Sequence, residues 1–100
     1  SNIKLSTLIL YFLVIKMRVE NDILNSAASS FLKKLRKQNG ITEGELAILL
    51  KISQQQVSRY ENGKTQLTIG RVNQYLEIFG LDWNYFTNEV IKNAKRLNGI

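Results

Sequence analysis

Two helix-start signals, eleven residues apart, constrain this chain more than any other feature of its sequence. Thr42 is followed three residues later by Glu45, and Ser53 is followed by Gln56, each pair in the form of a capping box. The spacing leaves room for about two turns of helix and a tight corner before the second helix begins. The apolar positions agree, since one buried set runs through both segments: Leu46, Ala47, Leu50, Ile52, Val57 and Tyr60. The stretch 42–63 is therefore predicted to form two short helices that pack across a corner.

The outward face of the second segment carries side chains suited to contacting nucleic-acid bases. Gln54, Gln55, Ser58 and Arg59 fall away from the apolar residues of that segment. Gln can make bidentate hydrogen bonds to the adenine edge in the major groove, and Arg can do so to guanine. Gln56 is expected to point away from this face and to act only as the cap partner. The segment thus has one face for packing and another for a polar ligand.

This stretch resembles the helix-turn-helix of the lambda-repressor/Cro-like (XRE) family of bacterial and phage DNA-binding regulators. The resemblance is carried by ELA at 45–47, VS at 57–58 and ENGK at 61–64, and it extends from about Phe31 to Phe86. It implies an all-α fold of five helices with the recognition helix, about 53–61, in the major groove. It also implies sequence-specific binding to double-stranded DNA, as a homodimer on palindromic half-sites about one helical turn apart.

The resemblance assigns roles to individual residues. Gln54, Gln55 and Arg59 are implied to contact bases. Phosphate contacts, which position a protein on DNA without reading its sequence, are expected from a polar and basic rim: Ser53, Ser58, Asn62, Lys64, Lys33 and Lys37. For the lysines, together with Lys34, the alternative is a solvated face that complements a helix C-terminus. A partly buried ion pair between Arg36 and Glu61 is implied to tie the first helix of the domain to the recognition helix.

Three residues in or beside the first short helix affect its phosphate contacts, its stability or the strain of the turn that follows it. Glu43 stands where the family has a Gln that donates to a phosphate; a carboxylate repels phosphate, so Glu43 is expected to serve its helix dipole instead. Lys51 stands where the turn usually has Gly, and it carries a small strain if its φ is positive. Gly44 weakens its helix by up to about 1 kcal/mol relative to Ala.

The inventory of reactive side chains argues against catalysis. The 100-residue chain contains no Cys and no His, which removes thiolate chemistry, the commonest general base and the commonest metal ligand. Its eight acidic residues are scattered singly, and we expect no enzymatic activity, no metal and no cofactor. The net charge is +6, and residues 30–66 hold seven Lys or Arg against three Glu. This excess favours an anionic partner at the proposed DNA face.

The other helices follow from apolar periodicity and caps. A helix from about Asn21 to Asn39, closed by Gly40, is predicted by seven apolar positions: Ile23, Leu24, Ala27, Ala28, Phe31, Leu32 and Leu35. A fourth helix starts at Thr68 and ends at Gly80. A fifth is capped by Asp82 and contains three aromatic residues expected in the core and in dimer contacts, Trp83, Tyr85 and Phe86. Residues 89–100 are expected to extend the fold as a helix with Gly99 as its C-cap.

The N-terminal segment, residues 1–20, forms an arm of uncertain structure. Its apolar run from Leu8 to Ile15 is eight residues long, where a membrane-spanning helix needs about 20. β-branched and aromatic residues favour a strand buried on both sides, with a helix as the alternative. The arm is expected to pair with a partner chain or to bind its own domain, unless residues 1–16 are upstream sequence and Met17 is the true start.

Three regions result: the arm at 1–20, a DNA-binding domain at 21–88 and the C-terminal extension at 89–100. The most direct function is regulation of transcription in the bacterial cytoplasm, at the nucleoid, with no membrane partner. The alternative is a protein-interaction module on the same fold, such as the antitoxin of a toxin–antitoxin pair whose arm holds the partner protein.

Overall fold

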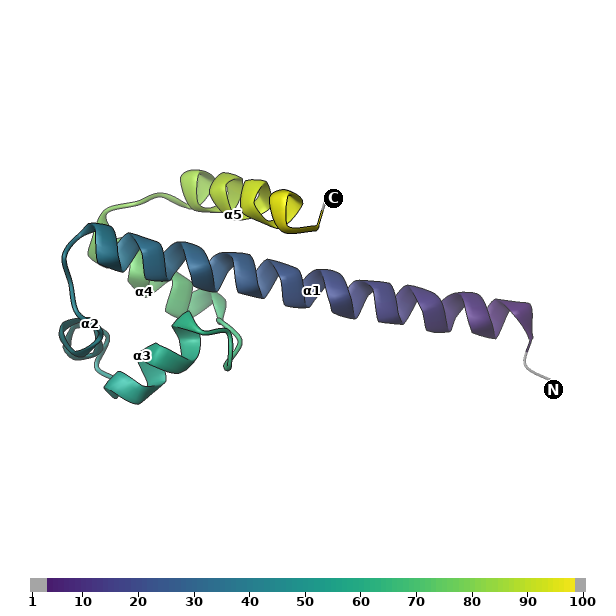
Figure 1. The fold of residues 1–100 in the computed structure, drawn as a ribbon, viewed down its shortest axis with the longest axis horizontal. Helices are drawn as coiled ribbons and strands as arrows, with labels where there is room; N and C mark the ends of the chain where they lie inside the picture. The colour runs from purple at the N-terminus through teal and green to yellow at the C-terminus, as the bar shows by residue number, and fades with distance from the viewer. Residues whose placement is uncertain (1–3, 99–100) are drawn as a thin grey trace.

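The computed structural model describes residues 4–98 as five helices joined by short turns (Figure 1). The helices are α1 (Leu5–Gln38), α2 (Glu43–Leu50), α3 (Gln54–Glu61), α4 (Ile69–Phe79) and α5 (Trp83–Asn98). The expected all-α architecture is therefore confirmed. No described helix combines the length and the apolarity that crossing a bilayer requires.

The strand favoured for the N-terminal arm is wrong, and the helical alternative holds. A single α-helix runs from Leu5 to Gln38, through the expected boundary at residues 20 and 21. Its sequence contains neither Gly nor Pro, so nothing interrupts the helical hydrogen bonds. A lone strand would leave its backbone groups unpaired, whereas a helix satisfies them within itself.

The N-terminal half of α1 projects away from the rest of the molecule (Figure 1). Every residue from Lys4 to Val19 is exposed, and the first α1 residue in contact with the core is Ile23. The other four helices gather around the C-terminal half of α1, so the longest axis of the molecule reaches 56 Å. From here on, the arm means residues 4–22, which are Lys4 and the first part of α1, and the body means the remainder of the described chain.

The core lies where α1, α2, α3 and α4 meet, and α5 closes it from the side. Its most completely buried side chains come from all four: Leu32, Leu46, Val57, Tyr75 and Leu76. α5 runs alongside α1 and contributes Phe86, Val90 and Ala94. Phe86 is in the core as expected, and its ring packs edge-on against those of Phe31 and Trp83. Trp83 and Tyr85 remain partly exposed.

The predicted caps define the helix ends. Thr68 accepts a hydrogen bond from the Arg71 backbone N–H, and Asp82 accepts one from Tyr85 N at 2.7 Å. Gly80 ends α4 with φ +67°, a conformation that only Gly adopts without strain. The predicted cap at Gly99 lies outside the described residues.

Candidate nucleic-acid interface

The corner between α2 and α3 is built as its capping signals predict. At Thr42 both bonds of the box form: Glu45 N donates to Thr42 Oγ1 at 3.1 Å, and Thr42 N donates to Glu45 Oε1 at 3.0 Å. These bonds to Thr42 lower the pKa of the Glu45 carboxyl. At Ser53 only half of the box is among the described hydrogen bonds, with Gln56 N donating to Ser53 Oγ at 3.1 Å.

Lys51 makes the turn itself. It ends α2 with φ +59° and ψ +42°, and it is the one non-glycine residue with positive φ in the described chain. The left-handed conformation lets Ile52 N donate to Ala47 O at 3.0 Å, which satisfies a carbonyl at the helix end. Lys51 therefore holds the strained position that the family gives to Gly.

α3 presents two different faces, because its apolar side is locked into the core. Val57 and Tyr60 are buried beneath it, while Gln54, Gln55 and Arg59 are exposed. The helix lies at the outside of the body beside α2 (Figure 1). The three residues expected to contact bases therefore share one accessible surface.

Gln54 lies close to the start of α2. An ideal Cβ added to Gly44 would stand 3.5 Å from Gln54 Oε1, so the absence of a side chain there leaves room for the amide. The N-terminal turn of α2 also carries unpaired backbone N–H groups and a partial positive charge. The Gln54 side chain therefore lies beside the N-terminal turn of α2.

Arg59 is held by the segment that follows α3. Its Nε donates to Thr65 Oγ1 at 3.1 Å, and its carbonyl accepts from Lys64 N at 2.8 Å. The Nε bond leaves the two terminal nitrogens of the guanidinium without a described hydrogen bond. Thr65 was not identified from the sequence, because it lies beyond the helix where no periodic pattern indicates which side chain it meets.

The residues expected to contact phosphates divide into two groups. Lys33, Asn62 and Ser58 form one polar chain, since Lys33 Nζ donates to Asn62 Oδ1 at 3.5 Å and Asn62 Nδ2 donates to Ser58 Oγ at 3.2 Å. Lys37 and Lys64 extend into solvent, whereas Ser53 Oγ is used by the cap of α3. The structure thus brings α1 and the end of α3 together around Asn62.

Arg36 and Glu61 are joined beneath this surface. Arg36 Nε donates to Glu61 Oε2 at 2.6 Å and Nη2 donates to Oε1 at 3.0 Å, while Nη1 donates to Ile41 O at 2.7 Å. The side chains are nearly inaccessible, with residue exposures of 7% and 4%. Hydrogen bonding to Glu61 raises the pKa of Arg36 above its usual value, although burial opposes the shift. One pair therefore fixes α3 on α1 and holds the loop before α2.

Two further contacts position the segment between α3 and α4. Leu67 N donates to Asn25 Oδ1 of α1 at 3.1 Å. The Arg71 guanidinium lies 5.5 Å from the centroid of the Tyr60 ring, and a hydrogen bond from Arg71 lowers the pKa of Tyr60. Asn25 was not identified from the sequence, since its partner is 42 residues away.

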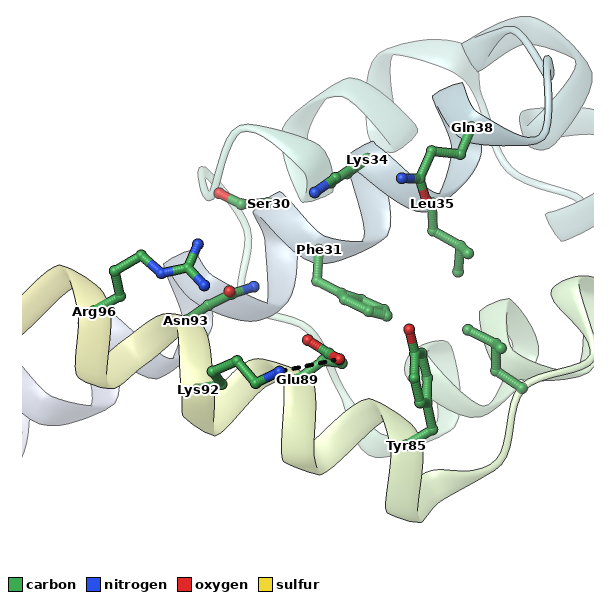
Figure 2. Close-up of a pocket in the computed structure, with 11 residues that line it drawn as sticks. Ser30, Phe31, Lys34, Leu35, Gln38, Tyr85, Glu89, Lys92, Asn93 and Arg96 are labelled. Atoms are coloured by element: carbon green, nitrogen blue, oxygen red, sulfur yellow. Dashed lines mark ion pairs between the residues drawn. The ribbon is translucent and has the colours of Figure 1, made fainter.

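A separate hollow of about 490 Å³ lies between α1 and α5, away from the exposed face of α3 (Figure 2). Phe31 and Tyr85 face each other in it, edge to face, with ring centroids 6.2 Å apart. Lys92 pairs with Glu89 at 3.7 Å on its rim. Among residues 4–98, no cluster of three or more His, Cys, Asp or Glu is placed to hold a metal ion. The best-formed candidate site is therefore the α2–α3 surface.

The region around α2 and α3 is also the region that matches known proteins. A sequence model of the helix-turn-helix family matches residues 32–86. A solved structure of a point mutant of the restriction-modification controller protein C.Esp1396I is similar, with a TM-score of 0.65 and 25% identity, over 72% of this chain and 96% of that one. No curated protein matches the chain in sequence. The arm lies outside the residues that the family model matches.

Proposed function

The chain belongs to the helix-turn-helix family, of the XRE type, and on that premise we propose that it is a sequence-specific, double-stranded-DNA-binding regulator of transcription that acts as a homodimer. The observation that carries the proposal is the exposed set Gln54, Gln55 and Arg59 on a helix whose other side is locked into the core. The similarity to a restriction-modification controller protein supports a regulatory role.

In this proposal α3 enters the major groove, with its N-terminal residues at the base edges. The amides of Gln54 and Gln55 each have a donor and an acceptor, which suits adenine N7 and N6. The Nε of Arg59 donates to Thr65, so the two terminal nitrogens of the guanidinium are available for guanine O6 and N7. A rigid guanidinium loses less conformational freedom on binding than a free one would.

The polar rim fixes the protein on the phosphate backbone. Asn62 is already oriented by Lys33 and Ser58, so a phosphate beside it meets a prearranged group of donors. Lys37 and Lys64 add exposed positive charge on either side of this group. Because neutralised phosphates release counterions, affinity should fall steeply as the salt concentration rises.

Two copies bound to a palindrome would each read one half-site, which is why a symmetric dimer is proposed. A protein with this role works where the chromosome is, so we place it in the bacterial cytoplasm, at the nucleoid. The residue inventory gives no support for a catalytic role, and binding rather than chemistry is the proposed activity.

The deciding experiment is selection of bound DNA from a random pool at defined salt. The wild-type chain should enrich one symmetric sequence, and Arg59→Ala should lose the preference for guanine at one position in each half-site. Arg96→Ala is the matched control, because Arg96 lies on α5 beside the separate hollow. A pool that shows no enrichment by the wild-type chain, or a preference unchanged in Arg59→Ala, would remove the proposed readout.

The exposed apolar arm supports a second candidate function, in which the protein is the antitoxin of a toxin–antitoxin pair. Here the arm would hold a toxin, and DNA binding would serve autoregulation. A small toxin-like gene beside this one, whose product binds the wild-type chain but not a Phe12→Glu variant, would favour it. Phe12 is 65% exposed, so this change should leave the body intact.

A further inference from the structure

The arm carries an apolar seam with the spacing of a coiled coil. Residues separated alternately by three and four positions line one side of the helix: Leu5, Leu8, Phe12, Ile15 and Val19. This is the a and d pattern of a heptad repeat, which brings one helix against another. The five side chains are between 38% and 73% exposed, so nothing in the described chain covers them.

The same heptad positions are covered further along α1. Toward the C-terminus they face α3 and the segment after it, and they are occupied by Ser26, Ser29, Lys33 and Arg36. The body thus uses this side of α1 to hold a helix, through polar contacts. The arm offers the same side without an occupant among the described residues, and it has apolar side chains at five heptad positions and Asp22 at the sixth.

We propose that this seam pairs with the arm of a second copy of the chain, as an antiparallel two-stranded coiled coil. The inference concerns a contact between two copies through their arms, and it does not depend on DNA binding. In the pairing that best fits, Leu8 of one copy packs against Val19 of the other, and Phe12 packs against Ile15. These contacts occur twice by symmetry and give four layers.

Length supports this pairing. With Leu8 opposite Val19, Lys4 of one copy lies opposite position 23 of the other. That is three residues before Ser26, where the segment after α3 approaches α1: an ideal Cβ at Gly63 would stand 4.0 Å from Ser26 Oγ. The described residues of the second arm therefore run along the uncovered length of α1 and stop short of Ser26.

Charge supports the antiparallel direction. Asp22 takes the heptad position after Val19, and in this pairing it lies opposite Leu5 of the second copy, where Lys4 of that copy can reach its carboxylate at each end of the pair. Arg18 lies on the flank of the seam beside the Tyr11 ring of the second copy, in reach of a cation–π contact. In a parallel pair Lys4 would lie beside Ile9 instead, and no acidic residue would face it.

The exposed apolar residues of α5 do not offer a comparable surface. Ile91 and Leu97 stand singly among Lys92, Lys95 and Arg96, whereas the arm has an unbroken seam. Contiguous exposed apolar surface of this kind is what marks a protein–protein contact. The pair leaves Leu10, Leu13 and Val14 facing outward on each arm.

Introduced thiols can test the pairing directly, because the chain has no Cys of its own. The double variant Leu8→Cys/Val19→Cys should give a disulfide-linked dimer in nearly all molecules on mild oxidation, whereas each single variant should stay monomeric on a non-reducing gel. The two thiols of one chain cannot join, since eleven residues of helix separate them by about 16 Å. The outward-facing control, Leu10→Cys/Met17→Cys, should not cross-link.

Sedimentation of the unmodified chain provides the second readout. We expect a dimer whose dissociation constant rises by roughly 100-fold or more in Phe12→Glu, since a charge would enter two central layers. An unchanged helical CD spectrum would show that the variant still folds. Cross-linking of either single variant, a dimer that survives Phe12→Glu, or a species larger than two copies would each overturn the pairing.

DNA binding distinguishes this inference from the proposed function. If the double-thiol variant does not cross-link but the chain still selects a DNA sequence, the arm pairing is wrong and the proposed DNA-binding function is supported. If the arms cross-link but no sequence is selected, the pairing stands and the proposed function fails.

Discussion

The Gln54 amide lies beside Gly44 across the corner of the motif. A Cβ built on Gly44 would meet Gln54 Oε1 at 3.5 Å, an ordinary van der Waals distance. The first side chain of α3 therefore lies next to the start of α2. The geometry has room for one methyl group at residue 44, whereas a side chain that extends past Cβ toward Gln54 would have to move the Gln54 amide.

Gly44→Ala should stabilise the protein without changing its DNA preference. Ala is favoured over Gly in a helix by up to about 1 kcal/mol, which corresponds to a rise in Tm of about 4–8 °C. Gly44→Leu should displace Gln54 and weaken selection at the position that Gln54 contacts. Thermal unfolding and DNA selection on both variants check this; equal DNA preferences in the Ala and Leu variants would contradict this position of Gln54.

Glu61→Ala should be strongly destabilising. It leaves Arg36 buried with only the Ile41 carbonyl as a described partner, and an unpaired buried charge costs about 3–5 kcal/mol. Urea unfolding measures the loss. The double variant Arg36→Met/Glu61→Leu removes both charges and should recover most of the stability, which a simple sum of two single losses would not allow.

Thr65→Val should weaken guanine discrimination while leaving the fold intact. The change keeps the shape of the side chain but removes the acceptor for Arg59 Nε. A hydrogen bond to a charged group contributes up to about 1.5–3 kcal/mol and less where it is exposed, so a loss of about several-fold in discrimination is expected. Thr65→Ser keeps a hydroxyl and should behave as wild type. Equal behaviour of the Val and Ser variants would show that Thr65 does not position Arg59.

Glu43→Gln should tighten DNA binding without altering the preferred sequence. The change replaces a carboxylate at the start of α2 with an amide that can donate to a phosphate. Titration at two salt concentrations checks it, because the difference from wild type should shrink as salt screens the repulsion. Weaker binding by the variant at low salt would place Glu43 away from the DNA backbone.

Tyr75 should make the protein sensitive to alkali. Burial raises the pKa of its hydroxyl well above the ordinary value of 10.0, and that hydroxyl has no described hydrogen-bond partner. Because the folded pKa is the higher one, the stabilising effect is present below pH 10 and is lost as pH rises beyond it. The pKa of Tyr60 shifts the opposite way, so the test must isolate Tyr75.

Tyr75→Phe is the matched change for that test. It should raise stability near neutral pH by about 1 kcal/mol, since it removes an unsatisfied buried polar group. It should also flatten the decline in stability above pH 10. Urea midpoints measured from pH 8 to pH 11 would decide; a decline of the same slope in both proteins would assign the alkaline loss to another group.

The sequence was sufficient for the elements whose signals are local. The caps at Thr42, Ser53 and Thr68 and the apolar stripe of each helix predicted the helices of the body, because these patterns are set by neighbours within a few residues. The sequence left the sign of φ at Lys51 open, and only the resemblance pointed to a turn Gly at this position; the structure gives φ +59°. The residues exposed on α3 followed from the positions of Val57 and Tyr60 beneath them.

Contacts between distant residues were less accessible to the same reasoning. The bonds from Arg59 to Thr65 and from Leu67 to Asn25 depend on how a loop returns to the body, which leaves no periodic trace. The pairing of Arg36 with Glu61 was expected only through the family resemblance. In the arm the β-branched and aromatic composition favours a strand, whereas the absence of any helix breaker favours the helix that the structure shows.

Because α1 is one continuous helix from Leu5 to Gln38, it fixes the rotation of the body about the helix axis relative to any molecule bound to the arm. Each residue inserted near position 21 would turn the body by about 100° and move it by about 1.5 Å, whereas seven would restore nearly the same bearing about 10 Å further out. An insertion or deletion in α1 therefore changes the orientation of the body more than its distance from the arm. If two copies pair through their arms, only changes of whole heptads would alter the distance between their bodies and nearly keep their orientation.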